Sequence, residues 1–412
     1  MSEDYDIVLI GNGLVGACAG ALLVRKAGID PARIALLGRA APPVPASGAA
    51  PEVRVAAVSR ASERVLRAAG GWQRLDAARL TPYERMCVWH ESVPPRSEGM
   101  LCFDAADLGE PDLGAIAELS ALTQACLESF VAAGGIQIAG ELEQLELTED
   151  AAFVSSGGVK LRSRLVVGAD GAHSEVRARS GLSARVRDYR QVALVANIAT
   201  QRPHEHTAWQ RFLRTGPLAL LPLFDGTSSI VWSADEPYAQ RLLECPDEEF
   251  EARLTVASDA VLGAARLASA RVSFPLRSVR ADGYVTTRCA LIGDAAHVIH
   301  PLAGQGANLG LLDAAALCES IASAVTEGED IGALRPLRRY EQQRRTHNLA
   351  TDAAMTAFRS GFALSRGPLP RLLSSGLAAV NRNDWLKRIL ARQALGVSGE
   401  LPQLARAQRS GI

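Results

Sequence analysis

The chain has 412 residues, too many for one ordinary hydrophobic core and enough for two or three packed units. Hydrophobic residues make up 48% and charged residues 22%, a balance typical of folded soluble proteins. The net charge of −1 argues against a general attraction to nucleic acid, so no nucleic-acid partner is expected. The charge is uneven, because residues 335–412 carry 14 Lys and Arg against 4 Asp and Glu. This basic segment indicates either a solvated helical face or contact with an anionic partner such as a membrane surface.

The cysteines and the N-terminus bear on the compartment. The seven cysteines are scattered and include no CxxC pair, which argues against a zinc knuckle or a disulfide framework and favours a reducing cytosol. The N-terminus enters a fold motif at once, so we expect no signal peptide. No apolar run approaches the roughly 18 residues that span a bilayer. We therefore expect a cytoplasmic protein whose membrane contact, if it has any, is peripheral.

The predicted elements begin with a βαβ unit. Asp6–Ile10 is a short apolar run typical of a buried parallel strand, and Arg33–Leu37 is a second. Between them, Leu14–Ala27 has a helical pattern closed by Gly28. This unit predicts the start of a doubly wound sheet. The proline-rich stretch Gly38–Pro51 that follows is expected to be a loop.

The sequence pattern in the middle of the chain changes near Arg185. Before that point, helical patterns cover Ser59–Ala69 and Ala115–Ala133, and a strand ends near Asp170. After it, short apolar segments alternate with turn residues, as in an antiparallel sheet. A helix and a strand are predicted to close this region, at Asp247–Leu267 and Arg271–Leu276.

These patterns predict an α/β fold with a discontinuous first domain. A Rossmann-like domain is interrupted by a mainly antiparallel β-sheet domain and followed by a helical C-terminal region. The expected boundaries are 1–75, 100–184 and 277–334 for the first domain, 76–99 and 185–276 for the second, and 335–412 for the third.

The first chemical motif is a GxGxxG sequence between a strand and a helix. Gly11 allows a tight turn, Gly13 lets the backbone approach a pyrophosphate, and Gly16 allows close packing of helix on strand. The helix begins with Leu14 and Val15, whose free N–H groups and partial positive charge favour a phosphate. The motif in this context predicts dinucleotide binding.

One expected residue of that motif is missing. An acid normally follows the second strand, about 20 residues further on, and binds the adenosine ribose. Here the strand ends in Gly38 and Arg39. Arg39 suits the 2′-phosphate of NADP, or else the backbone or another loop holds the ribose.

Two later motifs place acids at strand ends. Asp170 follows a strand in the sequence GADGAHSEVR, and Asp294 follows Gly293 after the strand CALI. In open α/β sheets, ligands bind at the carboxyl ends of the strands. Gly304 and Gly306 then lead into a helix whose N-terminus can face a developing anion.

The three motifs, in this order and spacing, resemble the group A FAD-dependent aromatic hydroxylases, which have the p-hydroxybenzoate hydroxylase-like fold. The stretch GDAAHVIHPLAGQGANLGLLDAAAL is similar to the ubiquinone-biosynthesis hydroxylases, which hydroxylate a polyprenylated phenol ring. The sequence departs from the family at Gly38 and at Glu118-Leu119, where relatives usually have Glu-Asn. Further stretches that match the family's pattern are Arg54–Trp72, Met86–His90, Phe274–Ser278 and Leu337–Leu349.

The resemblance implies FAD as the resident cofactor, NADPH or NADH as a transient reductant and O2 as co-substrate. It implies hydroxylation through a C4a-hydroperoxyflavin, and it assigns no catalytic side chain. The implied cofactor-binding residues are Gly11, Gly13, Leu14, Val15 and Gly16 at the pyrophosphate, Arg54 and Gln124 along the cleft, Asp170 near the dinucleotide, Gly293 and Asp294 at the ribityl chain, and Pro301, Gly304, Gln305, Gly306, Ala307 and Asn308 around the isoalloxazine.

The histidines and aromatics have simpler interpretations. His297 and His300 lack a third metal ligand and Pro301 argues against a helix there, so no metal site is expected. His297 is expected to be a packed or hydrogen-bonded residue beside the cofactor, and His204–His206 to form a surface turn. Core packing is favoured over a role in the pocket for Trp209, Leu220 and Phe224.

Three functions remain open at this stage. The first is hydroxylation of a polyprenyl phenol or quinol, with possible membrane contact through the basic C-terminal region. The second is a monooxygenase or reductase of the same fold acting on another aromatic substrate. The third is a flavin-bound scaffold within a quinone-biosynthesis complex.

Overall fold

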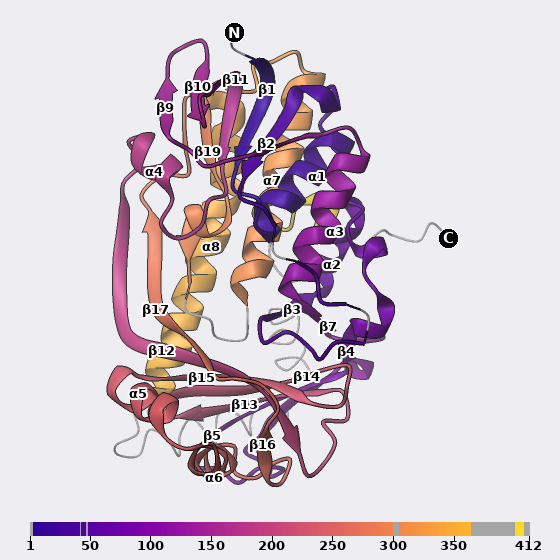
Figure 1. Ribbon diagram of the computed structural model, residues 1–412, viewed down its shortest axis with the longest axis vertical. Coiled ribbons are helices and arrows are strands. Elements are labelled where there is room, and N and C mark those ends of the chain that lie inside the picture. Colours follow the sequence, from indigo (N-terminus) through magenta and orange to yellow (C-terminus); the bar gives the residue numbers. More distant parts are fainter. Residues whose placement is uncertain (1–2, 42, 47, 300–304, 364–399, 408–412) are drawn as a thin grey trace.

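The computed structural model describes residues 3–41, 43–46, 48–299, 305–363 and 400–407 (Figure 1). Two layered units lie one above the other in this view, an α/β unit and a broad β-sheet unit. Two long strands, β12 (Ala184–Thr200) and β17 (Val272–Ala281), run from one unit to the other. The expected α/β fold class is confirmed.

The α/β unit is built on an eight-stranded sheet with a parallel centre. Its strand order is β18-β19-β11-β1-β2-β8, and β9 and β10 extend it beside β11. The central strands are buried on both faces, as continuous apolar runs predict. The strands are β1 (Glu3–Ile10), β2 (Ile34–Gly38), β8 (Ile136–Ala139), β9 (Gln144–Leu147), β10 (Ala152–Ser156), β11 (Val159–Gly168), β18 (Val285–Thr286) and β19 (Cys289–Leu291).

The register of this sheet brings three carboxyl ends to one edge. Ile10 at the end of β1 pairs with Gly168 of β11, and Gly168 pairs with Leu291 of β19. The residues that follow these strands therefore start from neighbouring points.

Helices cover the eight-stranded sheet. α1 (Leu14–Lys26) packs against α3 (Leu119–Ala132) and against α7 (Gln305–Thr326), and α7 packs against α2 (Arg60–Ala68) and α8 (Leu334–Ala363). A shorter helix, α4 (Glu175–Arg179), follows β11. Residues 400–407 return to this unit, where Leu404 N donates to a Glu319 carboxylate oxygen of α7 at 2.8 Å.

Helix α7 lies in the core. By length and composition alone, Gly306–Thr326 is the one described helix that could cross a membrane. However, 72% of its apolar 18-residue window is buried inside the structure. Its apolar character is therefore explained by packing against α1, α2 and α8.

The β-sheet unit is a nine-stranded sheet in the order β20-β17-β12-β15-β14-β13-β5-β6, with β16 beside β12. Helices α5 (Glu236–Glu244) and α6 (Asp247–Ala257) cover its outer face (Figure 1). A small sheet of β3 (Val55–Ser59), β7 (Gly114–Glu118) and β4 (Thr81–Tyr83) packs on the inner side. The remaining strands are β5 (Arg85–His90), β6 (Leu101–Asp104), β13 (Thr207–Leu213), β14 (Gly216–Pro222), β15 (Ser228–Asp235), β16 (Ala265–Leu267) and β20 (His297–Val298).

Two predicted helices are shorter than expected. The segment Ala115–Ala133 begins as strand β7, which is fully buried between β3 and β4, and turns helical only at Leu119. A short buried apolar run does not distinguish a strand from a helix by its pattern. The helix predicted over Asp247–Leu267 ends at Ala257, because Asp259 and Ala260 take positive φ values and the chain then forms β16.

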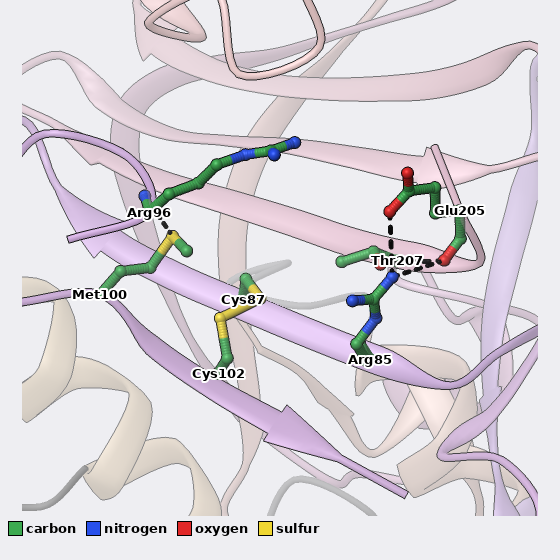
Figure 2. Close-up of a disulfide and its surroundings, with 7 residues drawn as sticks. All are labelled: Arg85, Cys87, Arg96, Met100, Cys102, Glu205 and Thr207. Atoms are coloured by element: carbon green, nitrogen blue, oxygen red, sulfur yellow. Dashed lines mark hydrogen bonds and ion pairs between the residues drawn. A yellow bond between two sulfur atoms is a disulfide. The ribbon is translucent and has the colours of Figure 1, made fainter. Parts of the chain in front are cut away.

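The scatter of the cysteines argues against a disulfide framework, but Cys87 and Cys102 form one disulfide. They lie directly opposite each other on β5 and β6, with Cα atoms 4.1 Å apart (Figure 2). Spacing in the sequence did not reveal the pair, because the register of the two strands is what makes them neighbours. The other five cysteines are free.

The turn at His204–His206 is only partly at the surface. Glu205 and His206 are exposed, but His204 is buried. The Nε2 atom of His204 lies 3.1 Å from the carbonyl oxygen of Leu223. Burial lowers the pKa of His204, so the ring is held as a neutral partner of that carbonyl.

Candidate functional site

The first two motifs meet through glycine backbone. Gly11 has φ +106°, and a Cβ atom there would lie 2.4 Å from the carbonyl oxygen of Ala169 in the second motif. A Cβ atom on Gly16 would lie 1.8 Å from the carbonyl oxygen of Gly11. The Ala169 N–H donates to Ile10 O at 2.8 Å. No side chain fits at Gly11 or Gly16, so the glycines set how closely helix and strand approach.

The third motif reaches the first through Val15. A Cβ atom on Gly293 would lie 3.1 Å from a Val15 methyl group, and one on Gly310 would lie 2.5 Å from the other. Val15 therefore fills a space that two glycines of the third motif leave open. Residues nearly three hundred positions apart in the chain thus form one surface.

Two further glycines leave open space. Among the described residues, a Cβ atom on Gly13 or on Gly306 would meet no atom within 4 Å beyond its chain neighbours and its own helix. Gly13 is the N-cap of α1 and provides no side-chain acceptor for the first N–H groups of the helix, while Leu14 is buried. Gly306 and Ala307 lie in the first turn of α7. Free N–H groups beside open space fit the pyrophosphate of a dinucleotide.

Asp170 acts locally, within its own motif. Its carboxylate accepts from Ser174 Oγ at 2.5 Å and from the Val176 N–H at 3.0 Å, which caps α4. Arg177 of the same motif donates to Ala295 O at 2.7 Å, next to Asp294. The second motif therefore supports the third through Arg177.

Asp294 lies in the 3-10 turn η5 (Gly293–Ala295), directly after β19. The residue is exposed. Nevertheless, desolvation by the surrounding protein raises the pKa of Asp294, and the charges of His297 and Arg54 oppose the shift. Arg54 precedes β3, and its guanidinium lies over the ring of Phe274 on β17, 5.5 Å from the centroid. Arg54 is therefore close enough for its positive charge to act on the carboxyl group of Asp294.

Asn308 and Gln124 make contacts of other kinds. The Asn308 amide donates to Ala57 O at 2.8 Å and accepts from Ser59 N at 3.0 Å, which fixes α7 to β3. Gln124 is on α3 and donates to Glu128 at 3.2 Å, in the wall of a cavity of about 230 Å³. These contacts do not join Gln124 to the three motifs. Of the other expected residues, Pro301 and Gly304 lie outside the described residues, as does the side chain of Gln305.

The second strand has no room for the missing acid. A Cβ atom on Gly38 would lie 2.4 Å from the side chain of Asn12, which is hydrogen-bonded to Arg39 O. The Arg39 side chain extends to Glu141, with 2.5 Å between Nε and Oε1. Asn12 therefore takes the space next to Gly38, and Arg39 has an acidic partner.

A buried polar network beside Asp294 was missed from the sequence. Asp313 of α7 is fully buried and contacts His297 and two α8 residues, Arg344 and Asn348. Burial opposes ionisation, yet the charges of His297 and Arg344 hold the pKa of Asp313 well below its usual range. A charged residue within the apolar run LGLLDAAAL was the available signal, since buried acids need partners. His297 is packed and hydrogen-bonded, as expected.

The inner face of the nine-stranded sheet presents apolar side chains to the α/β unit. Val272 and Phe274 are alternate residues of β17, so they share a face, and they are 38% and 36% exposed. Phe274 pairs with Ala193 and Val272 with Val195, and the next residue of β12 on this face is Asn197. Asn197 donates to Pro51 O, in the loop before β3, at 2.8 Å. This face therefore lies toward the segment that also carries Arg54.

Three side chains weighed for this wall in the sequence, Trp209, Leu220 and Phe224, lie elsewhere in the structure. Trp209 and Leu220 are buried in the outer-face core under α5 and α6, as the preference for core packing predicted. Phe224 is half-buried beneath the Arg79 guanidinium, 4.5 Å from its ring centroid.

Comparisons with known proteins agree with this geometry. The family described as FAD binding domain matches residues 4–353. The 3-demethoxyubiquinol 3-hydroxylase of Escherichia coli is 33% identical over 399 residues, covering 96% of this chain and 100% of the relative. The ubiquinone hydroxylase UbiL of Rhodospirillum rubrum is 33% identical, with coverage of 98% and 92%. The human ubiquinone biosynthesis monooxygenase COQ6 is 32% identical, with coverage of 93% and 91%.

Solved structures share the fold. The p-nitrophenol 4-monooxygenase PnpA of Pseudomonas putida superimposes with a TM-score of 0.74 at 17% identity, covering 96% of this chain and 99% of that one. PqsL of Pseudomonas aeruginosa superimposes with a TM-score of 0.73 at 22% identity, covering 91% and 99%. Family match, relatives and geometry agree that FAD is the cofactor. The chain belongs to the FAD-dependent hydroxylases of ubiquinone biosynthesis and is a flavoprotein monooxygenase.

Proposed function

We propose that this monooxygenase hydroxylates the ring of a polyprenylated phenol or benzoquinol during ubiquinone biosynthesis, with NADPH or NADH as reductant and O2 as co-substrate. The observation that carries this proposal is the apolar inner face of β17, where Phe274 is partly exposed and lies under the guanidinium of Arg54. A polyprenyl phenol is mostly hydrocarbon, and such a surface binds it by burying apolar area.

The FAD-binding roles follow from the local geometry. We assign the pyrophosphate to the open backbone at Gly13 and the N-terminus of α1. The solvent-facing carboxylate of Asp294 suits the hydroxyls of the ribityl chain, and Arg54 adds positive charge nearby. Gly306 at the start of α7 offers N–H groups to the flavin ring system.

The substrate role of the sheet follows from exclusion of water. When bound, FAD supplies the oxidising chemistry that transfers one oxygen atom of O2 to the ring. The protein must orient the ring and keep water away from it. Phe274, with the Arg54 guanidinium over its ring, combines an apolar wall with a cation at the edge of the cleft. We assign no side chain as the base for the phenol proton.

A membrane-associated substrate suits a peripheral location on the cytoplasmic side of a membrane. Exposed arginines of α8, among them Arg338 and Arg345, face solvent, and the basic segment continues through residues 364–399, which lie outside the described residues. Cationic surface of this kind is attracted to anionic lipid headgroups. Membership of a quinone-biosynthesis complex is compatible with the same surface. Flotation with vesicles containing anionic phospholipid, compared with neutral vesicles, tests the membrane contact.

The function is tested with purified protein. We expect flavin absorbance bands, and NADPH or NADH oxidation stimulated by a polyprenyl phenol in detergent, with a hydroxylated product identified by mass spectrometry. Stimulation by a phenol without the prenyl chain, at equal or lower concentration, would instead favour another aromatic substrate. Bound flavin without substrate-stimulated turnover would favour a scaffold in a biosynthetic complex.

A further inference from the structure

Asp313 uses both carboxylate oxygens within a fully buried network. Oδ2 accepts from the Gly293 N–H at 3.1 Å and lies 2.5 Å from His297 Nε2. Oδ1 accepts from Arg344 Nε at 2.8 Å and from Asn348 Nδ2 at 3.2 Å. Asp313 and Arg344 have no exposed side-chain surface. Four groups from two parts of the chain, the turn Gly293–His297 and helix α8, thus converge on one carboxylate.

The two contacts of Oδ2 lie on either side of Asp294. Gly293 precedes it with φ +58°, and His297 follows the 3-10 turn. His297 also begins β20, where it pairs with Arg280 of β17 in the nine-stranded sheet. The carboxylate of Asp313 therefore holds both ends of the turn that carries Asp294 and ties this turn to the strand that carries Phe274.

The contacts of Oδ1 fix Asp313 itself. Arg344 and Asn348 are one helical turn apart on α8, and Arg344 Nη2 donates to Asn348 Oδ1 at 2.9 Å. Asp313 thus reaches the turn from a position set by two packed helices, α7 and α8. A group held this rigidly is suited to orient a neighbouring ligand-binding residue.

We propose that Asp313 is a positioning residue for FAD, because it fixes the turn Gly293–His297 and thereby the place of Asp294. This inference rests on the proposed role of Asp294 at the ribityl chain. It deepens that role by naming a residue that touches neither cofactor nor substrate and still controls cofactor affinity.

Other contacts between α7 and α8 provide a comparison. Ser320 of α7 donates to Pro336 O at 2.5 Å and is also buried, but it does not contact the turn. Removing this contact loosens the same pair of helices without releasing Gly293 or His297. Ser320→Ala therefore separates a general loss of helix packing from a loss of positioning.

The test combines FAD titration of flavin-free protein with its thermal unfolding, for Asp294→Asn, His297→Gln, Asp313→Asn, Asp313→Asn/Arg344→Met and Ser320→Ala. We expect Asp294→Asn, His297→Gln and Asp313→Asn to weaken FAD binding by about tenfold or more, the effect that outer partners commonly have on ligand sites. The double variant removes the unpaired guanidinium, so it should regain thermal stability without regaining FAD affinity. Ser320→Ala should lower the unfolding temperature and leave FAD affinity unchanged.

Three outcomes would count against the idea. Wild-type FAD affinity in His297→Gln or Asp313→Asn, measured below the unfolding temperature, overturns it. So does a double variant that regains stability and affinity together, because that behaviour belongs to a purely structural charge pair. His297→Gln keeps the Asp313–Arg344 pair, so the test survives if Asp313→Asn does not fold. Unchanged affinity in Asp294→Asn would instead overturn the proposed role of Asp294.

Discussion

Two regions of the molecule, the edge of the α/β unit where the three motifs meet and the nine-stranded sheet, are held together by different forces. At the edge, glycine backbones approach within contact distance and a buried carboxylate has a partner for each oxygen. In the sheet, the outer-face core is apolar and aromatic. Among the described residues, Trp89, Trp209 and Trp232 bury indole N–H groups without a hydrogen-bond partner. The edge is therefore stabilised by close backbone contacts and a buried charge network, and the sheet by the burial and packing of apolar side chains.

The two regions are expected to tolerate substitutions to different degrees. Close backbone contact tolerates almost no substitution, whereas apolar cores accept many combinations of similar volume. The fold neighbours at 17% and 22% identity retain the overall architecture. We therefore expect substitutions at the edge to act on folding or FAD binding, and substitutions on the inner face of the sheet to act on the substrate.

The largest effects are expected from a pair of glycine variants at the edge where the motifs meet. In Gly16→Ala, the new methyl group would lie 1.8 Å from Gly11 O, so we expect loss of folded protein, a destabilisation above about 4–5 kcal/mol. In Gly13→Ala, the methyl group meets no protein atom. That variant should fold and lose FAD affinity, because the methyl group occupies the proposed pyrophosphate site. Soluble yield, circular dichroism and FAD titration measure both. Tight FAD binding by Gly13→Ala would contradict the assigned site.

The second prediction concerns the pH dependence of the buried network. His297 and Arg344 hold the pKa of Asp313 below its usual range, despite burial. Its contribution to stability is therefore full above about pH 4, near the pKa of an unfolded aspartate, and is lost as pH falls through the lower folded value. Asp313→Asn leaves a buried guanidinium unpaired and should cost about 3–5 kcal/mol at neutral pH.

Urea unfolding from pH 7 to pH 2 measures this contribution. The gap between wild type and variant should be widest at neutral pH and narrow with acid. A gap that stays constant over this range would show that Asp313 does not titrate differently in the folded and unfolded chains.

The third prediction tests the sheet through its disulfide. The bond joins residues 15 positions apart, and closing a loop of that length stabilises a chain by about 3 kcal/mol. In denaturant without reductant we expect five reactive thiols, and seven after reduction. Reductant should lower the unfolding midpoint of wild type and leave the double variant Cys87→Ser/Cys102→Ser unchanged. Cys245→Ser, at a half-buried free cysteine, is the matched control. Seven thiols without reductant would refute the bond.

Some features of the fold and the candidate site could be predicted from the sequence, because they depend on local patterns. The βαβ unit and the three motifs were predictable, because Gly11, Gly16 and Asp294 follow from local rules for turns and strand ends. The convergence of the motifs on one edge follows from the parallel register. The contacts at Val15, which bind the motifs together, depend on side chains far apart in the chain.

Other features depend on tertiary context that local patterns do not contain. The helix boundary at Leu119 is set by pairing of β7 with both neighbouring strands. The Cys87–Cys102 bond depends on strand register, and the partners of Asp313 come from another helix. A lone acid in an apolar helix could have flagged Asp313 but could not have named those partners.

The smallest expected effect lies on the inner face of the sheet. Phe274→Ala removes a ring that is 36% exposed from the proposed substrate wall. We therefore expect the KM for a polyprenyl phenol to rise about tenfold, equal to about 1.4 kcal/mol. FAD affinity should stay the same, because the ring is on the nine-stranded sheet and not on the edge of the α/β unit where the three motifs meet. Phe153→Ala is the matched control, since Phe153 is similarly exposed on β10. Steady-state kinetics and FAD titration of both variants decide the matter. A loss of FAD affinity with unchanged KM would show that Phe274 contributes to FAD binding and not to substrate binding, which contradicts the separate roles proposed for the two regions.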